Sequence, residues 1–206
     1  MFAEDRSKTS VVQSSVDVKS WLEKVPSVEA VRPGRCPRCG AASRAMGLPL
    51  GLWGHGLRER QQRGPLEPGA RPVTVVLLVR RYRCRSGGCV IIVVPRGVIA
   101  RRQFSGPAIG LAVALFGAGV PATEVRRLVS PWATLGATAA AGWASLRRWL
   151  RSIEDGRLFP RLLRRAPTAP RRMASWVGSA LAAFAPPALS KLPLHEQAFF
   201  GAAQMA

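Results

Sequence analysis

The sequence predicts an α+β fold in which a small antiparallel β domain is followed by a helical segment. Two close cysteine pairs, Cys36 with Cys39 and Cys84 with Cys89, mark the β domain. Runs of β-branched residues flank the second pair, and Gly- and Ala-rich stretches with helical periodicity follow it. We divide the chain into a flexible N-terminus with a short helix (1–30), a cysteine-bearing β domain with a long hairpin arm (31–104), a helical segment (105–156) and a basic, Pro/Ala-rich, partly disordered tail (157–206).

Three strands are expected in the β domain. Residues 73–83 read Val-Thr-Val-Val-Leu-Leu-Val-Arg-Arg-Tyr-Arg, a β-rich run that leads directly into Cys84. A second run follows over 90–94, and a further strand is expected near 53–62. The 44 residues from 40 to 83 separate the two cysteine pairs, where such pairs are usually about 15–20 residues apart. A long β-hairpin arm accounts for the difference.

Helices are expected on both sides of the β domain. Ser15 is placed to cap a short helix over 16–25, with Val18, Leu22 and Val25 on one face. Four further helices are predicted over 107–118, 121–129, 137–154 and 171–184.

The helix predicted over 137–154 is amphipathic. Its apolar face consists of Trp143, Leu146, Leu150 and Ile153. Trp143 and Trp149 lie at helical spacing, which is more typical of core residues than of residues that stack on bases. Pro131-Trp132 is expected to form a packing corner.

The chain carries a formal net charge of +20, from 31 basic and 11 acidic residues. Such an excess repels itself unless an anion is near, and nucleic acid is the commonest anionic partner, with an anionic membrane surface as the alternative. Of the basic residues 27 are Arg, a bias that a GC-rich coding sequence produces by itself. The net charge is therefore the better indication of a polyanionic partner.

Hydropathy argues against membrane insertion and secretion. Residues 1–20 are polar and contain no apolar signal-peptide core. The longest apolar stretches, 108–120 and 132–146, fall short of the roughly 20 residues that a membrane span needs. We therefore expect a cytoplasmic protein, in which cysteines serve as thiolate ligands more often than as disulfides.

The cysteine spacing predicts one structural zinc ion. Zinc favours four soft ligands in a tetrahedron, and two cysteine pairs on tight turns supply them. Pro37 and Gly40 suit the first turn, and Gly87 and Gly88 suit the second. Four thiolates leave no open coordination position for water, so hydrolytic chemistry at the metal is not expected. The predicted ligands are Cys36, Cys39, Cys84 and Cys89.

Other interpretations of these residues remain open. The four thiols can be unligated or redox-active, and His55 can replace one of them as a ligand. No βαβ pattern surrounds Cys36 and Cys39, which disfavours a thioredoxin-like role. His195 lies in the tail and is given no role.

With these residues in place, the segment from about 20 to 155 resembles the N-terminal zinc ribbon and helix-turn-helix region of bacterial insertion-sequence transposases. It also resembles a related stand-alone domain family of unknown function. The resemblance is carried by Cys-Pro-Arg-Cys-Gly at 36–40, by Arg-Tyr-Arg-Cys at 81–84 and by Cys89. It implies that the four cysteines bind zinc, that 107–154 is a helix-turn-helix, and that the module binds DNA ends.

The chain departs from those transposases in two ways. Residues 130–142 are longer than the turn of a normal helix-turn-helix, which leaves the recognition helix undefined. Transposase chemistry needs a set of acidic residues that hold two metal ions. After Glu124 the chain has only Glu154, Asp155 and Glu196. We therefore expect no enzymatic activity and no small-molecule substrate.

Arginines are the residues expected to contact nucleic acid, because a guanidinium group can bind two phosphate oxygens. One group, which includes Arg63, belongs to the hairpin arm and its flanks. The other belongs to the helix over 137–154 and its continuation, which carries Arg161, Arg164 and Arg165. The residues singled out for contact are Arg58, Arg60, Arg81, Arg83, Arg101, Arg102, Arg147, Arg148 and Arg151.

The expected function is therefore non-catalytic binding of nucleic acid, with double-stranded DNA as the partner. The alternatives are a protein–protein interaction module built on a structural zinc ribbon, and an RNA- or ribosome-associated protein. For each single Arg, the alternative is a solvated surface charge.

Overall fold

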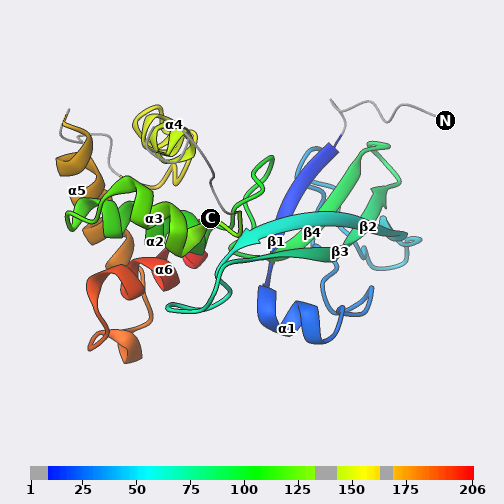
Figure 1. The fold of residues 1–206 in the computed structure, drawn as a ribbon. Coiled ribbons are helices and arrows are strands. Elements are labelled where there is room, and N and C mark those ends of the chain that lie inside the picture. Colours follow the sequence, from blue (N-terminus) through cyan, green and yellow to red (C-terminus); the bar gives the residue numbers. More distant parts are fainter. Residues whose placement is uncertain (1–8, 133–142, 163–168) are drawn as a thin grey trace. The chain divides into compact units, whose positions relative to one another are not determined.

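The computed structural model describes residues 9–132, 143–162 and 169–206. It divides into two compact units, one formed by residues 1–61 and 76–96 and the other by residues 62–75 and 97–206. Within the described residues, a four-stranded sheet is followed along the chain by helices (Figure 1). The predicted α+β fold class is confirmed.

The predicted hairpin arm is present. It consists of β2 (Leu52–Gly64) and β3 (Val73–Cys84), which are neighbours in the sheet order β1-β4-β3-β2. Residues 65–72 connect the two strands. Because a parallel pair would need a crossover of about a dozen residues or more, this short connection makes the pair an antiparallel hairpin. The arm brings the two distant cysteine pairs of the sequence to one end of the sheet.

The central strand β4 (Val90–Arg96) pairs on both sides. It is antiparallel to β3, with Tyr82 opposite Ile91, and parallel to β1 (Thr9–Asp17). Five consecutive residues of β4, Ile91 to Pro95, are buried, as expected for a strand with a neighbour on each edge. The sheet is therefore mixed.

The prediction of a flexible N-terminus is wrong from residue 9 onward, because Thr9–Asp17 form strand β1. Val11 and Val12 are paired with Ile92 and Val93 of β4. The segment is polar, so its sequence alone gives little indication of a strand. Its backbone is ordered by hydrogen bonds to a strand about 80 residues away, a long-range contact that local propensity does not encode.

The first helix is shorter than predicted and has a different buried face. Helix α1 spans Val18–Glu23 and is capped by Asp17, whose carboxylate accepts the Ser20 N–H at 3.0 Å. Trp21 is the buried residue, and Leu22 is exposed. The Trp21 indole N–H donates to the Leu78 carbonyl at 3.0 Å, which ties the helix to β3.

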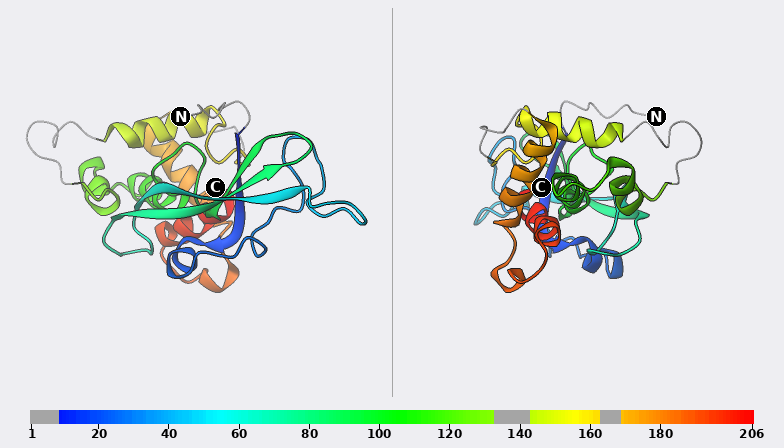
Figure 2. Two further views of the ribbon diagram at one scale, coloured as in Figure 1. Left: turned by 90° about the vertical axis from the view of Figure 1, so that its right-hand side faces the viewer. Right: turned by 60° about the vertical axis from the view of Figure 1, so that its left-hand side comes forward.

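Helix α2 (Gly106–Gly117) is the centre of the second unit. It is apolar on every side, and Gly106 to Ala114 are all buried. It packs against α5 (Pro170–Ala182) and α6 (Leu194–Met205), which pack against each other as well (Figures 1 and 2). A 3-10 turn, Pro187–Leu189, lies between them in sequence.

Glycines let these helices approach closely. A Cβ at Gly110 would lie 2.6 Å from the Ala202 Cβ, and one at Gly201 would lie 1.8 Å from the Leu181 carbonyl oxygen. The core of this unit includes residues of both C-terminal helices, such as Val177 and Phe199. The prediction of a partly disordered tail is therefore wrong for 170–182 and 194–205, because the buried faces of these helices complete the core.

The remaining helices are α3 (Ala122–Val129) and α4 (Ala144–Glu154). The predicted apolar face of α4 is buried, with Arg147, Arg148 and Arg151 exposed on the other side. The part of the predicted helix over 137–142 lies outside the described residues. Among the helices that the structure describes, none is both long enough and apolar enough to cross a membrane.

Candidate metal centre and arginine-lined hollows

The two cysteine turns have the same backbone hydrogen bonds. In each, the N–H of the first cysteine, Cys36 or Cys84, donates at 2.9 Å to the carbonyl five positions later. Its own carbonyl accepts the N–H of Gly40 or Gly88, four positions later, at 3.0 Å. Both glycines have positive φ, 71° and 61°, which glycine adopts without strain. Two different cysteine spacings therefore fold into one type of turn.

The second cysteine of each pair lies at a different place relative to its turn. Cys39 lies on the first turn itself, whereas Cys89 lies beyond the second turn, directly before β4. At the position that corresponds to Cys39, the second turn has Gly87, whose N–H donates to the Cys84 Sγ at 3.4 Å. A Cβ on Gly87 would lie 3.4 Å from the Cys39 Sγ, an ordinary van der Waals contact, so this position lies directly beside the neighbouring thiol.

The four sulfur atoms converge to form what we call the thiol cluster: Cys36, Cys39, Cys84 and Cys89. The Sγ atoms of Cys36 and Cys89 are 3.3 Å apart, and those of Cys39 and Cys84 are 3.5 Å apart. The sulfurs of Cys36, Cys39 and Cys84 all lie within 4.8 Å of one another. These distances exceed the roughly 2.05 Å of a disulfide, and all four cysteines are free. The cluster could hold one metal ion.

Two opposing effects act on the thiols. Burial raises the pKa of Cys36, but the backbone amides of Cys39 and Arg38 outweigh it and bring that pKa down to about 7. Burial, together with the hydrogen bond and charge of Cys36, raises the pKa of Cys89 to about 11. Thiols this close cannot all ionise without a compensating charge, which a divalent cation provides.

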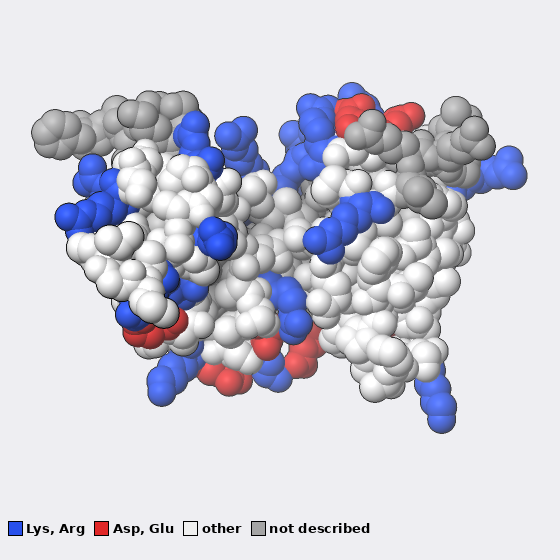
Figure 3. Space-filling model, turned by 180° about the vertical axis from the view of Figure 1, so that it is seen from behind, with Lys and Arg blue, Asp and Glu red and all other residues white. Residues whose placement is uncertain are grey.

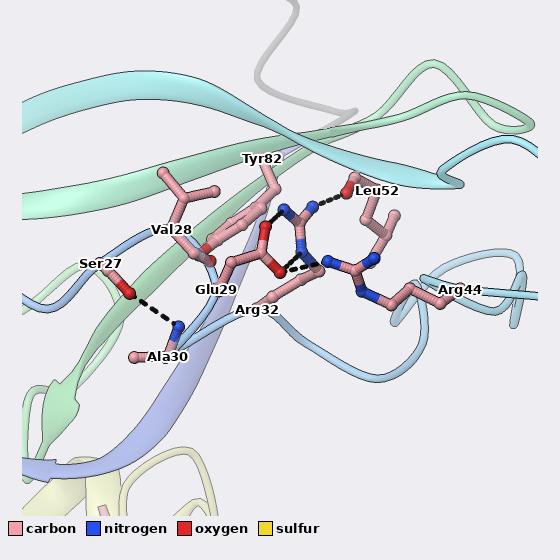
Figure 4. Close-up of polar contacts among 8 residues, drawn as sticks. All are labelled: Ser27, Val28, Glu29, Ala30, Arg32, Arg44, Leu52 and Tyr82. Carbon is pink, nitrogen blue, oxygen red and sulfur yellow. Dashed lines mark hydrogen bonds and ion pairs between the residues drawn. The ribbon is translucent and has the colours of Figure 1, made fainter.

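The segment that precedes the first turn is fixed to the sheet (Figure 4). Tyr82, fully buried on β3, donates its hydroxyl to the Val28 carbonyl at 2.6 Å. The Arg32 side chain is only 6% exposed, donates to the Leu52 carbonyl and pairs with Glu29. Its guanidinium carbon lies 5.6 Å from the centroid of the Tyr82 ring. These contacts hold the chain leading to Cys36 against the strand leading to Cys84.

His55 is not a member of the thiol cluster. It lies on β2, and the metal-binding group found among the described residues consists of cysteines only. The structure offers no support for the alternative in which His55 replaces a thiolate.

The arginines singled out from the sequence fall into two sets. Arg58, Arg60, Arg81 and Arg83 lie on β2 and β3 in the first unit. Burial, with a smaller contribution from the charge of Arg58, lowers the pKa of Arg60. The second unit contains the rest: Arg101, Arg102, Arg147, Arg148 and Arg151.

Four of the second set line one hollow of about 930 Å³, which lies within the second unit. These are Arg101 and Arg102, which precede α2, and Arg147 and Arg148 on the exposed side of α4. Arg151 is exposed but is not in the lining. Two more arginines complete the lining, Arg63 from the end of β2 and Arg126 from α3. Arg126 was not anticipated, because an Arg on a short amphipathic helix gives no sequence signal of where it points.

A second hollow of about 700 Å³ shares Arg126, Ser130 and Trp132 with the first and adds Arg71 and Arg127. We call the two adjoining hollows the arginine track. No Asp or Glu is among the described residues that line either of them.

The tryptophans of this region have different roles. Trp143 and Trp149 are core residues, as predicted: they are 5% and 4% exposed and pack edge to face with each other and with Phe104. Trp132 was expected to form a packing corner, and that expectation is wrong because its side chain is 56% exposed. The Arg63 guanidinium lies over its ring, 3.9 Å from the centroid.

On the face shown in Figure 3, Lys and Arg side chains are scattered among uncharged residues, and Asp and Glu occupy fewer places. Comparisons with protein-family models, with curated proteins and with solved structures gave no match to this chain.

Proposed function

We propose that the chain is a non-catalytic, cytoplasmic zinc-ribbon protein that binds nucleic acid, with double-stranded DNA as its partner. The convergence of the four cysteine sulfurs is the observation that carries the zinc assignment. Zn–S bonds of about 2.3 Å at the tetrahedral angle put neighbouring sulfurs about 3.8 Å apart. Two of the sulfur pairs, Cys36 with Cys89 and Cys39 with Cys84, are 3.3 and 3.5 Å apart, which is close to that spacing.

The proposed zinc is structural. Cys36, Cys39, Cys84 and Cys89 would occupy all four positions of a tetrahedral ion, which leaves none for water or substrate. Bound zinc would neutralise thiolate charge and lock together two turns that are about 45 residues apart along the chain. Its role is to hold β3 and the loop before β2 in place.

The nucleic-acid assignment is supported by charge. A net charge of +20 on 206 residues favours a polyanion, and the second unit gathers arginines from four segments around the same hollow. The resemblance to transposase ribbons favours DNA. In this proposal α2, α3 and α4 correspond to the helix-turn-helix region, although residues 130–143 separate α3 from α4.

Two measurements test the proposal together. Metal analysis of the purified chain should give about one zinc per chain, and Cys84→Ser should lower that content and the stability of the first unit. Binding of a labelled duplex should weaken steeply with salt, because each phosphate neutralised releases counterions. A first unit that folds equally well without metal would overturn the zinc ribbon. Salt-insensitive binding to a protein, with arginine variants unimpaired, would favour the interaction-module alternative.

A further inference from the structure

We infer that the arginine track binds single-stranded nucleic acid, with an unpaired base stacked on Trp132 and the backbone phosphates on the surrounding arginines. The inference rests on the proposed function in one respect, that the polyanion is a nucleic acid. It adds a second mode of recognition, for unpaired nucleotides, to the duplex binding proposed above.

The shape of the track suits a strand better than a small molecule. Two hollows of about 930 and 700 Å³ meet at Arg126, Ser130 and Trp132, so the ring stands between them. Each is of the size that usually accommodates one drug-sized ligand. A chain of several nucleotides can follow both hollows past the ring, whereas a mononucleotide would occupy only one.

The charge of the track suits phosphate. Among the described residues, eight arginines line the two hollows: Arg63, Arg71, Arg101, Arg102, Arg126, Arg127, Arg147 and Arg148. Some of their donors already have partners. Arg127 is paired with Glu124, which is not in the lining, Arg63 donates to Gln103, and Arg102 donates to Ser152. The buried Nε of Arg126 has no hydrogen-bond partner among the described residues, although a buried polar atom normally has one. A phosphate in the track would meet the guanidinium groups that line it, which can donate hydrogen bonds to its oxygens.

Trp132 is the residue that favours an unpaired base. More than half of its surface is exposed, whereas Trp143 and Trp149 are committed to the core. The Arg63 guanidinium lies over the Trp132 ring, 3.9 Å from its centroid, and restrains the side chain. Less side-chain entropy is therefore lost when a base stacks on the ring. Bases inside a duplex already stack on each other and are not accessible to a ring in a hollow, whereas those of a single strand are.

The test uses the full, zinc-loaded chain and fluorescence anisotropy of labelled oligonucleotides. Wild type should bind a twelve-residue oligo-dT, and affinity should rise with length from the dinucleotide upward and fall with salt. Stacking of one base is worth about 1–3 kcal/mol, so Trp132→Ala should weaken binding of the oligo-dT about 5- to 150-fold. Trp132→Phe keeps an aromatic ring and should retain most of the affinity.

Matched controls separate this effect from general loss of charge or of structure. Trp53→Ala removes a partly exposed tryptophan of the first unit, and Arg172→Ala removes an exposed arginine of α5 outside the track. Both should bind the oligo-dT nearly as wild type does, and Arg147→Ala should not. Thermal unfolding of Trp132→Ala should match wild type, because the exposed ring contributes little to the core.

The outcomes are distinguishable. If oligo-dT binds but Trp132→Ala has no effect, or if dTMP binds as tightly as the twelve-residue strand, the track does not hold a strand and the inference is wrong. If a duplex still binds in that case, the proposed function stands without it. If no nucleic acid of any form binds, the proposed function itself fails. An oligo-rU of the same length, measured in parallel, shows whether the strand is DNA or RNA.

Discussion

Gly40 and Gly88 occupy the same position in the two cysteine turns, and both adopt a left-handed backbone conformation. The space around each is open, since a Cβ at either position would meet no heavy atom within 4 Å. The need for glycine at these two positions is thus one of backbone conformation rather than of space. A substitution at either glycine therefore tests the conformation of the turn without disturbing the packing of the thiol cluster.

We predict that Gly88→Ala destabilises the zinc-loaded protein by about 1–2 kcal/mol, the cost of placing an L-residue in the left-handed region. Gly34→Ala is the matched control, because Gly34 also has open space and has no positive φ. Denaturant unfolding of both variants measures the difference. Equal stabilities would show that the turn can relax to another conformation.

The ion pairs of Glu29 are expected to make the stability of the protein depend on pH. Its carboxylate pairs with Arg32 and with Arg44 (Figure 4). The Arg32 hydrogen bond, followed by that of Arg44, lowers the pKa of Glu29 from its ordinary 4.5 to about 2. A lowered pKa in the folded state means that the carboxylate contributes stability above pH 4.5, and that this contribution is lost as the pH falls toward about 2.

The expected result is that Glu29→Gln is less stable than wild type at pH 7 and that the difference disappears in acid over this range. Comparing the two proteins at each pH removes the effect of metal loss, which both share. The free energy of unfolding from denaturant titrations at several pH values checks this. A difference that stays constant down to pH 2 would show that Glu29 acts through packing and not through its charge.

At the scale of elements, the strands and helices with strong local patterns were predictable and the rest were not. The β-branched run before Cys84 and the apolar stretch of α2 match their observed elements within a few residues. Strand β1 was missed because its order depends on pairing with β4. The four cysteines could be recognised as a group from spacing alone, whereas the meeting of Arg126 with Arg147 depends on how α3 and α4 pack.

Helix α6, by contrast, has a helical pattern of apolar residues in its sequence. Ala198, Phe199, Ala202 and Met205 follow the spacing of one helical face, and all four are buried. The flanking Pro and Ala residues led instead to the prediction of a partly disordered tail over this segment. The close approach of α6 to its neighbours, which depends on Gly201, is what secures its place in the core.

Gly201→Ala should therefore destabilise the protein markedly, because the added methyl would overlap the Leu181 carbonyl and force α6 away from α5. Overpacking of this kind costs about 1–3 kcal/mol. Gln204→Ala, at an exposed position of the same helix, is the control and should change stability little. Thermal unfolding monitored by circular dichroism compares the two variants. If Gly201→Ala unfolds at the same temperature as Gln204→Ala, the backbones of α5 and α6 are not in contact.

On the scale of the whole molecule, the candidate metal centre and the large cluster of buried apolar residues lie in different units. The large cluster of buried apolar residues from Ala108 to Met205 belongs to the second unit alone. The thiol cluster belongs to the first, where residues 24–51 have no helix or strand and the only bridge among them joins Arg35 to Ala42. That segment is held by turns and by the contacts of Val28 and Arg32 with the sheet, so a bound metal would add to its order.

Removal of the metal by a chelator should therefore loosen the cysteine turns of the first unit and leave the helices of the second unit folded. With the metal removed, amides of residues 34–51 and 84–89 should lose protection from hydrogen exchange, because the two cysteine turns are then no longer held together. Amides of α2, α5 and α6 should keep their protection, since their packing involves no thiol. Hydrogen exchange followed by mass spectrometry, with and without EDTA, resolves these segments, and re-addition of zinc should restore the lost protection. Loss of protection in α2, α5 and α6 together with the turns would show that the two units unfold as one, so that the metal stabilises the entire chain.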